Sequence, residues 1–273
     1  MTEQSPPIKP PPGFRVLLEG PAGTGKTTAC RTLVAAGLTP FFVFTEPSMN
    51  MVGDIPCPKL HYTYSGQESI GWGAMIKNAK NIAFIQNEDL QKAGRTGVGL
   101  NTWVSFLEHF NNYICDRCGE SFGDVEKWGT DRVLIVDGLT GLSKAARLLA
   151  VGFKSILSQP DWGVAMTQID QMIFKLKSDL QCHLVMIAHI EPEKNEVTGG
   201  VKNYPSTLGR KLGPIIPTYF QDVILASVSH GDFYWTTVSG DTDTVGRNLP
   251  LKDKMSPDFA PLLAGWKAKS GMK

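Results

Sequence analysis

The sequence predicts an α/β fold with a mostly parallel central sheet, flanking helices and a C-terminal β-hairpin. First, an apolar run at residues 14–19 leads into a glycine-rich turn and then a helix-like run. Second, further apolar runs end in polar residues at Glu46, Asp137 and His189. Such continuous apolar runs are typical of strands buried on both faces of a parallel sheet. Third, amphipathic segments with helical spacing separate these runs.

The glycine-rich turn at residues 20–27 matches the phosphate-loop pattern G-x-x-x-x-G-K-[ST] in full. Its glycines allow backbone N–H groups to surround a phosphate, and the dipole of the helix predicted at residues 28–36 favours the anion. We expect Lys26 to reach the β- and γ-phosphates and the Thr27 hydroxyl to hold Mg²⁺. The turn therefore predicts a nucleoside triphosphate site, formed by Gly20, Pro21, Ala22, Gly23, Thr24, Gly25, Lys26, Thr27 and Thr28.

The composition is that of a soluble globular protein, since 42% of the 273 residues are hydrophobic and 19% are charged. A net charge of +1 provides no overall field for nucleic acid or membrane, so any DNA binding requires a local patch. Five cysteines without a signal peptide favour a reducing cytoplasm over a disulfide framework. No apolar run is long enough to span a membrane. We therefore expect a cytoplasmic protein without a membrane partner.

A second strand is predicted at residues 41–45, where a continuous apolar run ends at Glu46. We expect it to lie next to the phosphate loop, where ligands bind in open α/β sheets. Glu46 would then polarise the water that attacks the γ-phosphate. A solvated loop glutamate is the alternative.

The central part of the chain contains a candidate zinc site. Cys115 and Cys118 form a single C-x-x-C, which is half of such a site. The other half could be Cys57 with His61, or His109. An exposed loop with two reduced thiols is the alternative, because nothing in the sequence brings these residues together. A redox pair fits less well, since the motif does not open a helix after a strand.

Two further apolar runs end in candidate site residues. Residues 132–137 form a Walker B pattern, in which Asp137 would orient a water on Mg²⁺. Residues 183–188 precede His189, which could sense the γ-phosphate by hydrogen bonding from a neighbouring strand. A core or loop histidine is the alternative for His189. Helical spacing predicts helices at residues 69–80, 101–113, 139–151 and 161–180.

The segment after His189, residues 191–204, is polar and long for a connector. Its basic and aromatic residues suit single-stranded nucleic acid, and a solvated hairpin or loop is the alternative. These residues are Lys194, Lys202 and Tyr204, with Arg210 and Lys211 just beyond.

The C-terminal region contains a predicted hairpin of residues 222–228 and 233–238. Three cations follow it, Arg247, Lys252 and Lys254. They are candidates for reaching the nucleotide of a neighbouring subunit, as in-trans cations do in nucleotide hydrolases. A solvated surface is the alternative.

This order of parts resembles the RecA-like P-loop ATPase core, and more closely the phage-encoded ATP-binding proteins of that class, including RecA-like single-strand annealing proteins. The resemblance covers residues 14–265. It implies that Glu46 is the catalytic glutamate and that His189 stands where the bacterial recombinase has an amide. It also implies DNA-binding loops near residues 160–162 and 191–204, and in-trans cations at Lys252 and Lys254, with Arg247 a further candidate.

The resemblance implies an Mg²⁺- and ATP-dependent ATPase that acts on single-stranded DNA in phage recombination or replication, by annealing or by assisting a recombinase. A homo-oligomer and a single-strand-binding or replication protein are the implied partners. The rivals are a nucleotide-gated loader or assembly ATPase with a protein partner and, less favoured, a small-molecule kinase. The predicted organisation is a disordered Pro-rich tail (1–13), an ATPase domain (14–265) with an insertion-like region (56–129), and a basic tail (266–273).

Overall fold

The computed structural model describes residues 11–66, 72–73, 75–77, 80, 98–151, 158–194 and 200–271. The Pro-rich tail predicted at residues 1–13 lies largely outside the described residues. Of the helix predicted at 69–80, residues 72–73, 75–77 and 80 are described, and they are helical. Where the chain enters the described part, the Pro12 carbonyl accepts a hydrogen bond from the Trp266 indole (3.1 Å), and the Gly13 N–H donates one to the Gln181 carbonyl (2.9 Å).

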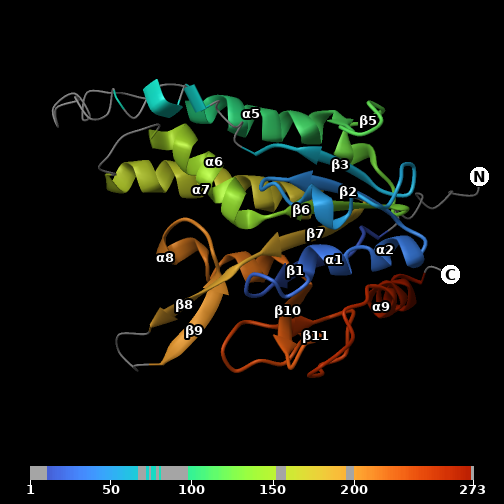
Figure 1. The fold of residues 1–273 in the computed structure, drawn as a ribbon. Coiled ribbons are helices and arrows are strands. Elements are labelled where there is room, and N and C mark those ends of the chain that lie inside the picture. The colour runs from blue at the N-terminus through green and yellow to red at the C-terminus, as the bar shows by residue number, and fades with distance from the viewer. Residues whose placement is uncertain are drawn as a thin grey trace, which may run out of the picture.

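A mostly parallel sheet forms the centre of the molecule (Figure 1). Its strands follow the order β11 (Asp232–Thr236), β10 (Asp222–Ser229), β1 (Arg15–Glu19), β7 (His183–Ala188), β6 (Arg132–Asp137), β2 (Thr39–Phe44) and β3 (His61–Tyr64). All pairs from β10 to β3 are parallel, whereas β11 and the short β12 (Val245–Gly246) pair with β10 in the antiparallel sense. The predicted fold class is confirmed.

The place of β2 differs from the prediction. We expected this strand beside the phosphate loop, but β7 and β6 lie between β2 and β1. A polar residue after an apolar run marks the edge at which a strand ends. It does not identify the strand's neighbours, because all parallel strands of a sheet end at the same edge.

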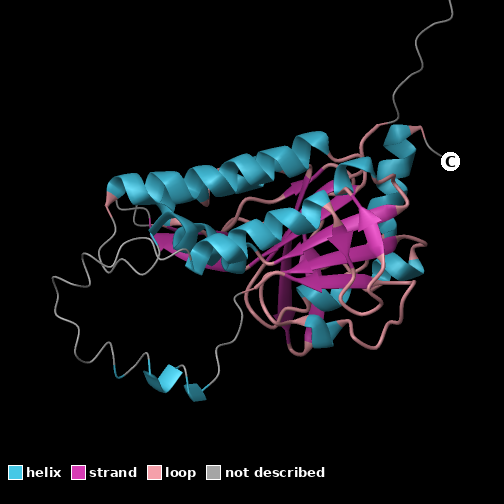
Figure 2. Ribbon diagram, turned by 90° about the horizontal axis from the view of Figure 1, so that it is seen from above, coloured by secondary structure: helices cyan, strands magenta, loops and turns pink. Residues whose placement is uncertain are grey.

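Helices cover both faces of the sheet. One face carries α5 (Val98–Asn111), α6 (Leu139–Val151) and α7 (Gln159–Asp179), and the other carries α1 (Lys26–Ala29), α2 (Thr32–Ala35) and α9 (Ala260–Ser270) (Figure 1). From above, the long helices lie over the strands (Figure 2). Two hydrophobic clusters fill the layers, one on each side of the sheet. No helix of the described part combines the length and apolarity needed to cross a bilayer.

The helix after the phosphate loop is shorter than predicted. Instead of one helix at residues 28–36, α1 and α2 are separated by Cys30 and Arg31. The Thr32 hydroxyl donates to the Ala29 carbonyl (2.8 Å) and accepts from the Phe259 N–H (3.0 Å). A threonine side chain that bonds nearby backbone competes with regular helix, which accounts for the interruption.

Residues 160–162 also differ from the prediction, because they form the first turn of α7 rather than a loop. Ser158 and Asp161 cap this helix in a reciprocal capping box, in which the Ser158 N–H donates to the Asp161 carboxylate at 2.9 Å. Trp162 packs against the core. Residues 160–162 are therefore helical rather than a loop, and DNA contact at this turn stays a prediction.

The polar segment after His189 forms a two-stranded ribbon rather than a long loop. Its strands, β8 (Ile190–Lys194) and β9 (Val201–Pro205), pair in the antiparallel sense and extend away from the sheet below α8 (Gly209–Leu212) (Figure 1). Opposite charges face each other where Glu193 pairs with Lys202. The described part of this segment is therefore a hairpin, and its binding of nucleic acid stays a prediction; residues 195–199 lie outside the described part.

The C-terminal hairpin is confirmed, with β10 and β11 joined by a tight turn in which His230 (φ 53°) and Gly231 (φ 89°) have positive φ. A second small sheet, β4 (Tyr113–Ile114) with β5 (Ser121–Gly123), follows α5. Three short 3₁₀ helices complete the described elements, η1 (Met49–Met51), η2 (Val125–Lys127) and η3 (Ile216–Tyr219).

Candidate active site

The phosphate loop lies between β1 and α1, at the carboxyl edge of the sheet. The Gly20 N–H donates to the Ala188 carbonyl at the end of β7 (3.2 Å), which joins the loop to the neighbouring strand. A Cβ on Gly20 would lie 2.2 Å from the Ala226 carbonyl oxygen, and Gly25 has a φ of 74°. The loop therefore requires glycine at both positions.

Lys26 is buried within this loop. Its ammonium group donates to the carbonyls of Gly20 (2.8 Å) and Pro21 (2.7 Å), and it lies 3.4 Å from the Thr24 hydroxyl. Burial lowers the pKa of Lys26 to about 8, although the nearby Asp137 acts in the opposite direction. A buried cation held only by neutral oxygens is suited to bind an anion that enters the loop.

Thr27 and Asp137 form the candidate metal site. The Thr27 hydroxyl donates to Asp137 Oδ2 at 2.7 Å, although the two residues are 110 positions apart. Burial raises the pKa of Asp137 to about 6, against the effects of the Thr27 hydrogen bond and of Lys26. A hydroxyl and a carboxylate are hard oxygen donors of the kind that Mg²⁺ prefers beside a phosphate, so these residues fit the ion.

Glu46 reaches the same edge although β2 is not adjacent to β1. The Thr45 N–H donates to the Asp137 carbonyl (2.7 Å), and Thr45 Oγ1 donates to the Gly138 carbonyl (2.6 Å). These bonds join the ends of β2 and β6. The negative charge of Glu46 raises the pKa of Asp137, as expected for two neighbouring carboxylates. Lys144 of α6 pairs with Glu46 at 3.4 Å, and a third of the Glu46 side chain is exposed.

His189 follows β7, which is the neighbour of the Walker B strand β6 as predicted. Burial lowers the pKa of His189, the charge of Lys26 lowers it further, and Glu46 raises it. These electrostatic interactions mean that His189 shares the surroundings of both residues. The structure therefore brings together Lys26, Thr27, Glu46, Asp137 and His189.

Three residues of this region were missed from the sequence. Glu19 ends β1 as a buried carboxylate, whose Oε1 accepts a hydrogen bond from Thr242 Oγ1 (2.8 Å). Phe233, half exposed on β11, lies against the loop, since a Cβ on Gly25 would come within 3.2 Å of its ring. Lys144 is the ion-pair partner of Glu46. An acid within an apolar run was an available signal for Glu19, whereas the other two depend on contacts between distant segments.

The candidate in-trans cations, Arg247, Lys252 and Lys254, are all exposed. They lie on the segment that follows β12 at the β10–β11 side of the sheet. Lys254 Nζ lies 5.7 Å from the centre of the Tyr234 ring. This exposure is compatible with a role towards another subunit, and the residues stay candidates.

Two of the basic residues on the ribbon and on the adjoining α8 pair with acids of the same chain. Lys202 pairs with Asp243 at 2.6 Å and lies 5.4 Å from the centre of the Tyr204 ring. Arg210 pairs with Glu193 at 3.4 Å, whereas Lys194 and Lys211 are exposed. A groove of about 400 Å³ between β8, β9 and α8 is lined by both acids and bases, among them Glu191, Glu193, Lys194 and Arg210.

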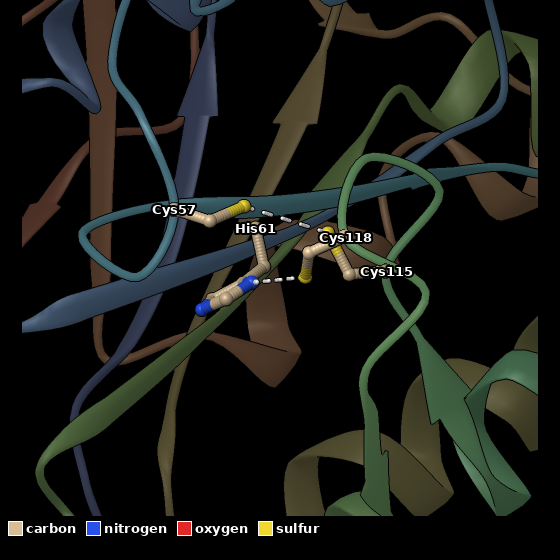
Figure 3. A group of neighbouring side chains, drawn as sticks. All are labelled: Cys57, His61, Cys115 and Cys118. Carbon is tan, nitrogen blue, oxygen red and sulfur yellow. Dashed lines mark hydrogen bonds between the residues drawn. The ribbon is translucent and has the colours of Figure 1, made fainter.

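The candidate zinc ligands Cys57, His61, Cys115 and Cys118 converge (Figure 3). His109, the alternative ligand, instead contacts the Thr63 hydroxyl at 3.3 Å. The pairing of the C-x-x-C with Cys57 and His61 is therefore the one that the fold provides. This cluster is compatible with a bound zinc ion.

Residues 13–249 match the sequence model of a family described as AAA domain. The chain belongs to this family. It is accordingly a P-loop ATPase of the AAA type, and the matched residues include the phosphate loop, Glu46, Asp137 and His189. No curated protein matches the chain. The resemblance to P-loop ATPases inferred from the motifs is confirmed at this level.

Proposed function

We propose that this AAA-family ATPase is Mg²⁺-dependent and RecA-like, and that it acts on single-stranded DNA in phage recombination or replication, by annealing strands or assisting a recombinase. One observation carries the proposal. His189 stands beside the nucleotide site, and the next residue begins the ribbon strand β8. A nucleotide-dependent movement at His189 therefore has a direct covalent route to the ribbon.

In the proposed mechanism, Lys26 binds the β- and γ-phosphate oxygens, and Thr27 and Asp137 hold Mg²⁺. Glu46 orients the attacking water and accepts its proton. Mg²⁺, when bound, neutralises the charge on the phosphate oxygens. Phe233 lies at the side of the loop, where its half-exposed ring can pack against the nucleobase.

Two sets of hydrogen bonds support coupling between the nucleotide site and the ribbon. At the base of the ribbon, the Ser206 N–H, just after β9, donates to the carbonyl of His189, just before β8 (2.7 Å), and Ser206 Oγ donates to Oε1 of Glu191 on β8 (2.6 Å). On β9, Thr242 Oγ1 lies within hydrogen-bond distance of both Glu19 Oε1 (2.8 Å) and the Asn203 carbonyl (3.1 Å). Both strands of the ribbon are thus joined to residues at the edge of the phosphate-loop region.

The DNA part of the proposal rests on basic and aromatic side chains of the ribbon and of the adjoining α8. Tyr204 offers a ring on which a base can stack, and Lys194, Lys202 and Arg210 can approach phosphates. We further propose that the protein works as a homo-oligomer in the host cytoplasm, with Arg247, Lys252 or Lys254 reaching a neighbour's nucleotide. A single-strand-binding or replication protein is the proposed additional partner.

ATP turnover with and without single-stranded DNA, over a range of salt concentrations, tests this function. We expect single-stranded DNA to raise turnover at low salt and the effect to decline as salt rises. Double-stranded DNA of equal phosphate concentration is the control. ATP hydrolysis that is indifferent to single-stranded DNA at every salt concentration would contradict the DNA part and leave the ATPase intact.

A loader or assembly ATPase with a protein partner is the second candidate, and the ribbon's ion pairs favour it. Lys202 and Arg210 each pair with an acid, so the groove beside the ribbon presents mixed charge rather than a basic track. Mixed charge suits a protein surface better than a polyphosphate. ATP-dependent oligomers with weak, salt-sensitive DNA affinity would favour this candidate.

A further inference from the structure

Four metal-binding side chains from two distant segments meet at the outer strand of the sheet (Figure 3). Cys57 comes from the turn before β3, His61 is the first residue of β3, and Cys115 and Cys118 come from the turn between β4 and β5. One ligand atom of each residue lies within 4.8 Å of those of the other three. The four side chains point towards a common centre.

Two of the spacings between these atoms are close to those expected around a tetrahedral zinc ion. With Zn–S and Zn–N bonds of about 2.3 and 2.0–2.1 Å, tetrahedral ligands lie about 3.8 Å apart for two sulfurs and about 3.5 Å for sulfur and nitrogen. Cys57 Sγ lies 3.9 Å from Cys115 Sγ, and Cys118 Sγ lies 3.8 Å from His61 Nδ1. A disulfide requires about 2.05 Å between sulfurs, so Cys57 and Cys115 are free thiols and not a bonded pair.

We propose that Cys57, His61, Cys115 and Cys118 form a structural Cys₃His zinc site. The protein supplies all four ligands, and a site closed in this way has no position for a substrate or a reactive water. The site therefore stabilises the fold and performs no chemistry of its own. It goes beyond the proposed ATPase function and does not depend on it.

The surroundings hold the ligands in place. The His61 ring packs between Phe41 and Phe122, with ring centres 4.8 and 4.3 Å away. The turn of Cys115 and Cys118 closes at Gly119 (φ 71°), whose N–H donates to the Cys115 carbonyl at 2.8 Å. A left-handed glycine after the second cysteine lets the chain fold back so that both thiols face the same point.

The same turn also binds the edge of the sheet. The Asp116 N–H donates to the Tyr62 carbonyl (3.0 Å), and the Asp116 carboxylate accepts from the Tyr64 N–H (2.8 Å) and from the Thr63 hydroxyl (3.1 Å). β3 is otherwise an edge strand, and edge strands are open to pairing with other chains. The zinc site would hold the Cys115–Cys118 turn against the open edge of β3.

The site is remote from the nucleotide. His61 is the first residue of β3, whereas the nucleotide site lies at the carboxyl ends of the strands. Strands β2, β6 and β7 separate β3 from β1, a span of about 19 Å at about 4.8 Å per strand. Loss of zinc should therefore act on stability and assembly rather than on phosphate contacts.

Metal content and a matched pair of histidine variants test the proposal. The full-length protein, purified without chelator, should contain about one zinc per chain. His61→Asn should lose most of this zinc, whereas His109→Asn, which changes the neighbouring histidine beside β3, should keep it. Absence of stoichiometric zinc in the wild type, or equal zinc in both variants, would overturn the proposal.

Cobalt substitution of the wild type gives a readout that does not depend on how the variants fold. The protein grown with Co²⁺ should show the strong visible absorption of tetrahedral cobalt with thiolate ligands, and zinc should displace it. Octahedral cobalt spectra would contradict the site. So would intact-mass and peptide-mapping data that show a Cys57–Cys115 disulfide in protein kept under reducing conditions.

Discussion

The charged side chains at the phosphate-loop edge of the sheet differ in their surroundings from those at the β8–β9 ribbon. At the edge, Lys26 and Asp137 are buried, and the Lys26 ammonium is held by neutral oxygens. On the ribbon and the adjoining α8, Lys202 and Arg210 are paired with acids of the same chain. At the phosphate loop, the charge stays available to a ligand. Near the ribbon, the charges are already neutralised by acids of the same chain.

The difference shows which function each region supports most directly. Burying charge is costly, so a fold retains it where a ligand repays the desolvation. The phosphate-loop edge has this property, and the ATPase family agrees with it. Exposed ion pairs contribute little stability and can exchange partners, so the ribbon is compatible with DNA or with a protein surface.

The largest expected effect comes from removing the buried cation. Lys26→Ala should lower ATP turnover by at least ~10²–10³-fold, because charge stabilisation at the transferred phosphate is lost. Lys175→Ala, which removes an exposed lysine paired with Glu126 and Asp179, should leave turnover unchanged. Steady-state kinetics with circular dichroism as a folding control would measure both. Equal turnover in the two variants would contradict the claim that the buried charge of Lys26, and not an exposed lysine, supports ATP hydrolysis.

The next effect concerns stability and pH at Glu19. Burial raises the pKa of Glu19 from its ordinary 4.5 to about 7, against the hydrogen bond from Thr242, and the nearby Asp243 raises it further. In the unfolded chain Glu19 ionises near pH 4.5, so the folded state binds more protons between pH 4.5 and 7. The contribution of Glu19 to the free energy of unfolding therefore falls as pH rises from 4.5 to about 7.

Glu19→Gln imitates the protonated carboxyl and should remove this loss. We expect little change in the free energy of unfolding at pH 5 and a gain of up to about 3 kcal/mol at pH 8. Thermal or urea unfolding at the two pH values measures the difference. A variant that is less stable than the wild type at pH 8 would show that the ionised carboxylate has a favourable partner.

A smaller effect is expected at Phe233, which extends the phosphate-loop region towards the hairpin. Phe233→Ala should weaken ATP binding by about 1–3 kcal/mol if the ring stacks on the base. Binding of inorganic triphosphate, which has no base, should not change. Calorimetry measures the affinity for both ligands. An equal loss of affinity for ATP and for inorganic triphosphate would show that the ring supports the phosphate loop and does not contact the base.

The smallest effect is expected on the ribbon. If Lys202 leaves Asp243 to contact a phosphate, Lys202→Ala should reduce the salt-dependence slope of single-stranded DNA binding by about 1. Asp243→Asn should then strengthen binding, because it releases the lysine. Fluorescence anisotropy over a salt series measures both variants. An unchanged slope in both variants would show that Lys202 does not contact DNA phosphates, and would favour a protein partner.

The sequence predicted those parts of the fold in which local pattern determines structure. Asp137 and His189 lie at the ends of strands that can be predicted from their continuous apolar runs, because both faces of these strands are buried. The strands of the ribbon were harder to predict, since they lie outside the main sheet and lack an apolar face. The order of strands could not be deduced, because register and neighbours depend on packing between distant segments.

The same limit applied to the sites. The phosphate loop is a contiguous motif, so Lys26 and Thr27 were identified directly. Cys57 and His61 could be named as partners of the C-x-x-C, but only the fold distinguishes His61 from His109. Phe233 and Lys144 carry no local signal, because their positions depend on the packing of β11 and α6.

The most direct test of the central claim is ATP binding and hydrolysis by Glu46→Gln. In the proposed mechanism, Lys26, Thr27 and Asp137 bind the nucleotide and Mg²⁺, and Glu46 accepts the proton of the attacking water. The variant should therefore bind Mg·ATP with the wild-type Kd and hydrolyse it ~10²–10⁴-fold more slowly in a single turnover. Wild-type hydrolysis by the variant would contradict the role of Glu46, and hydrolysis without Mg²⁺ would contradict the site as a whole.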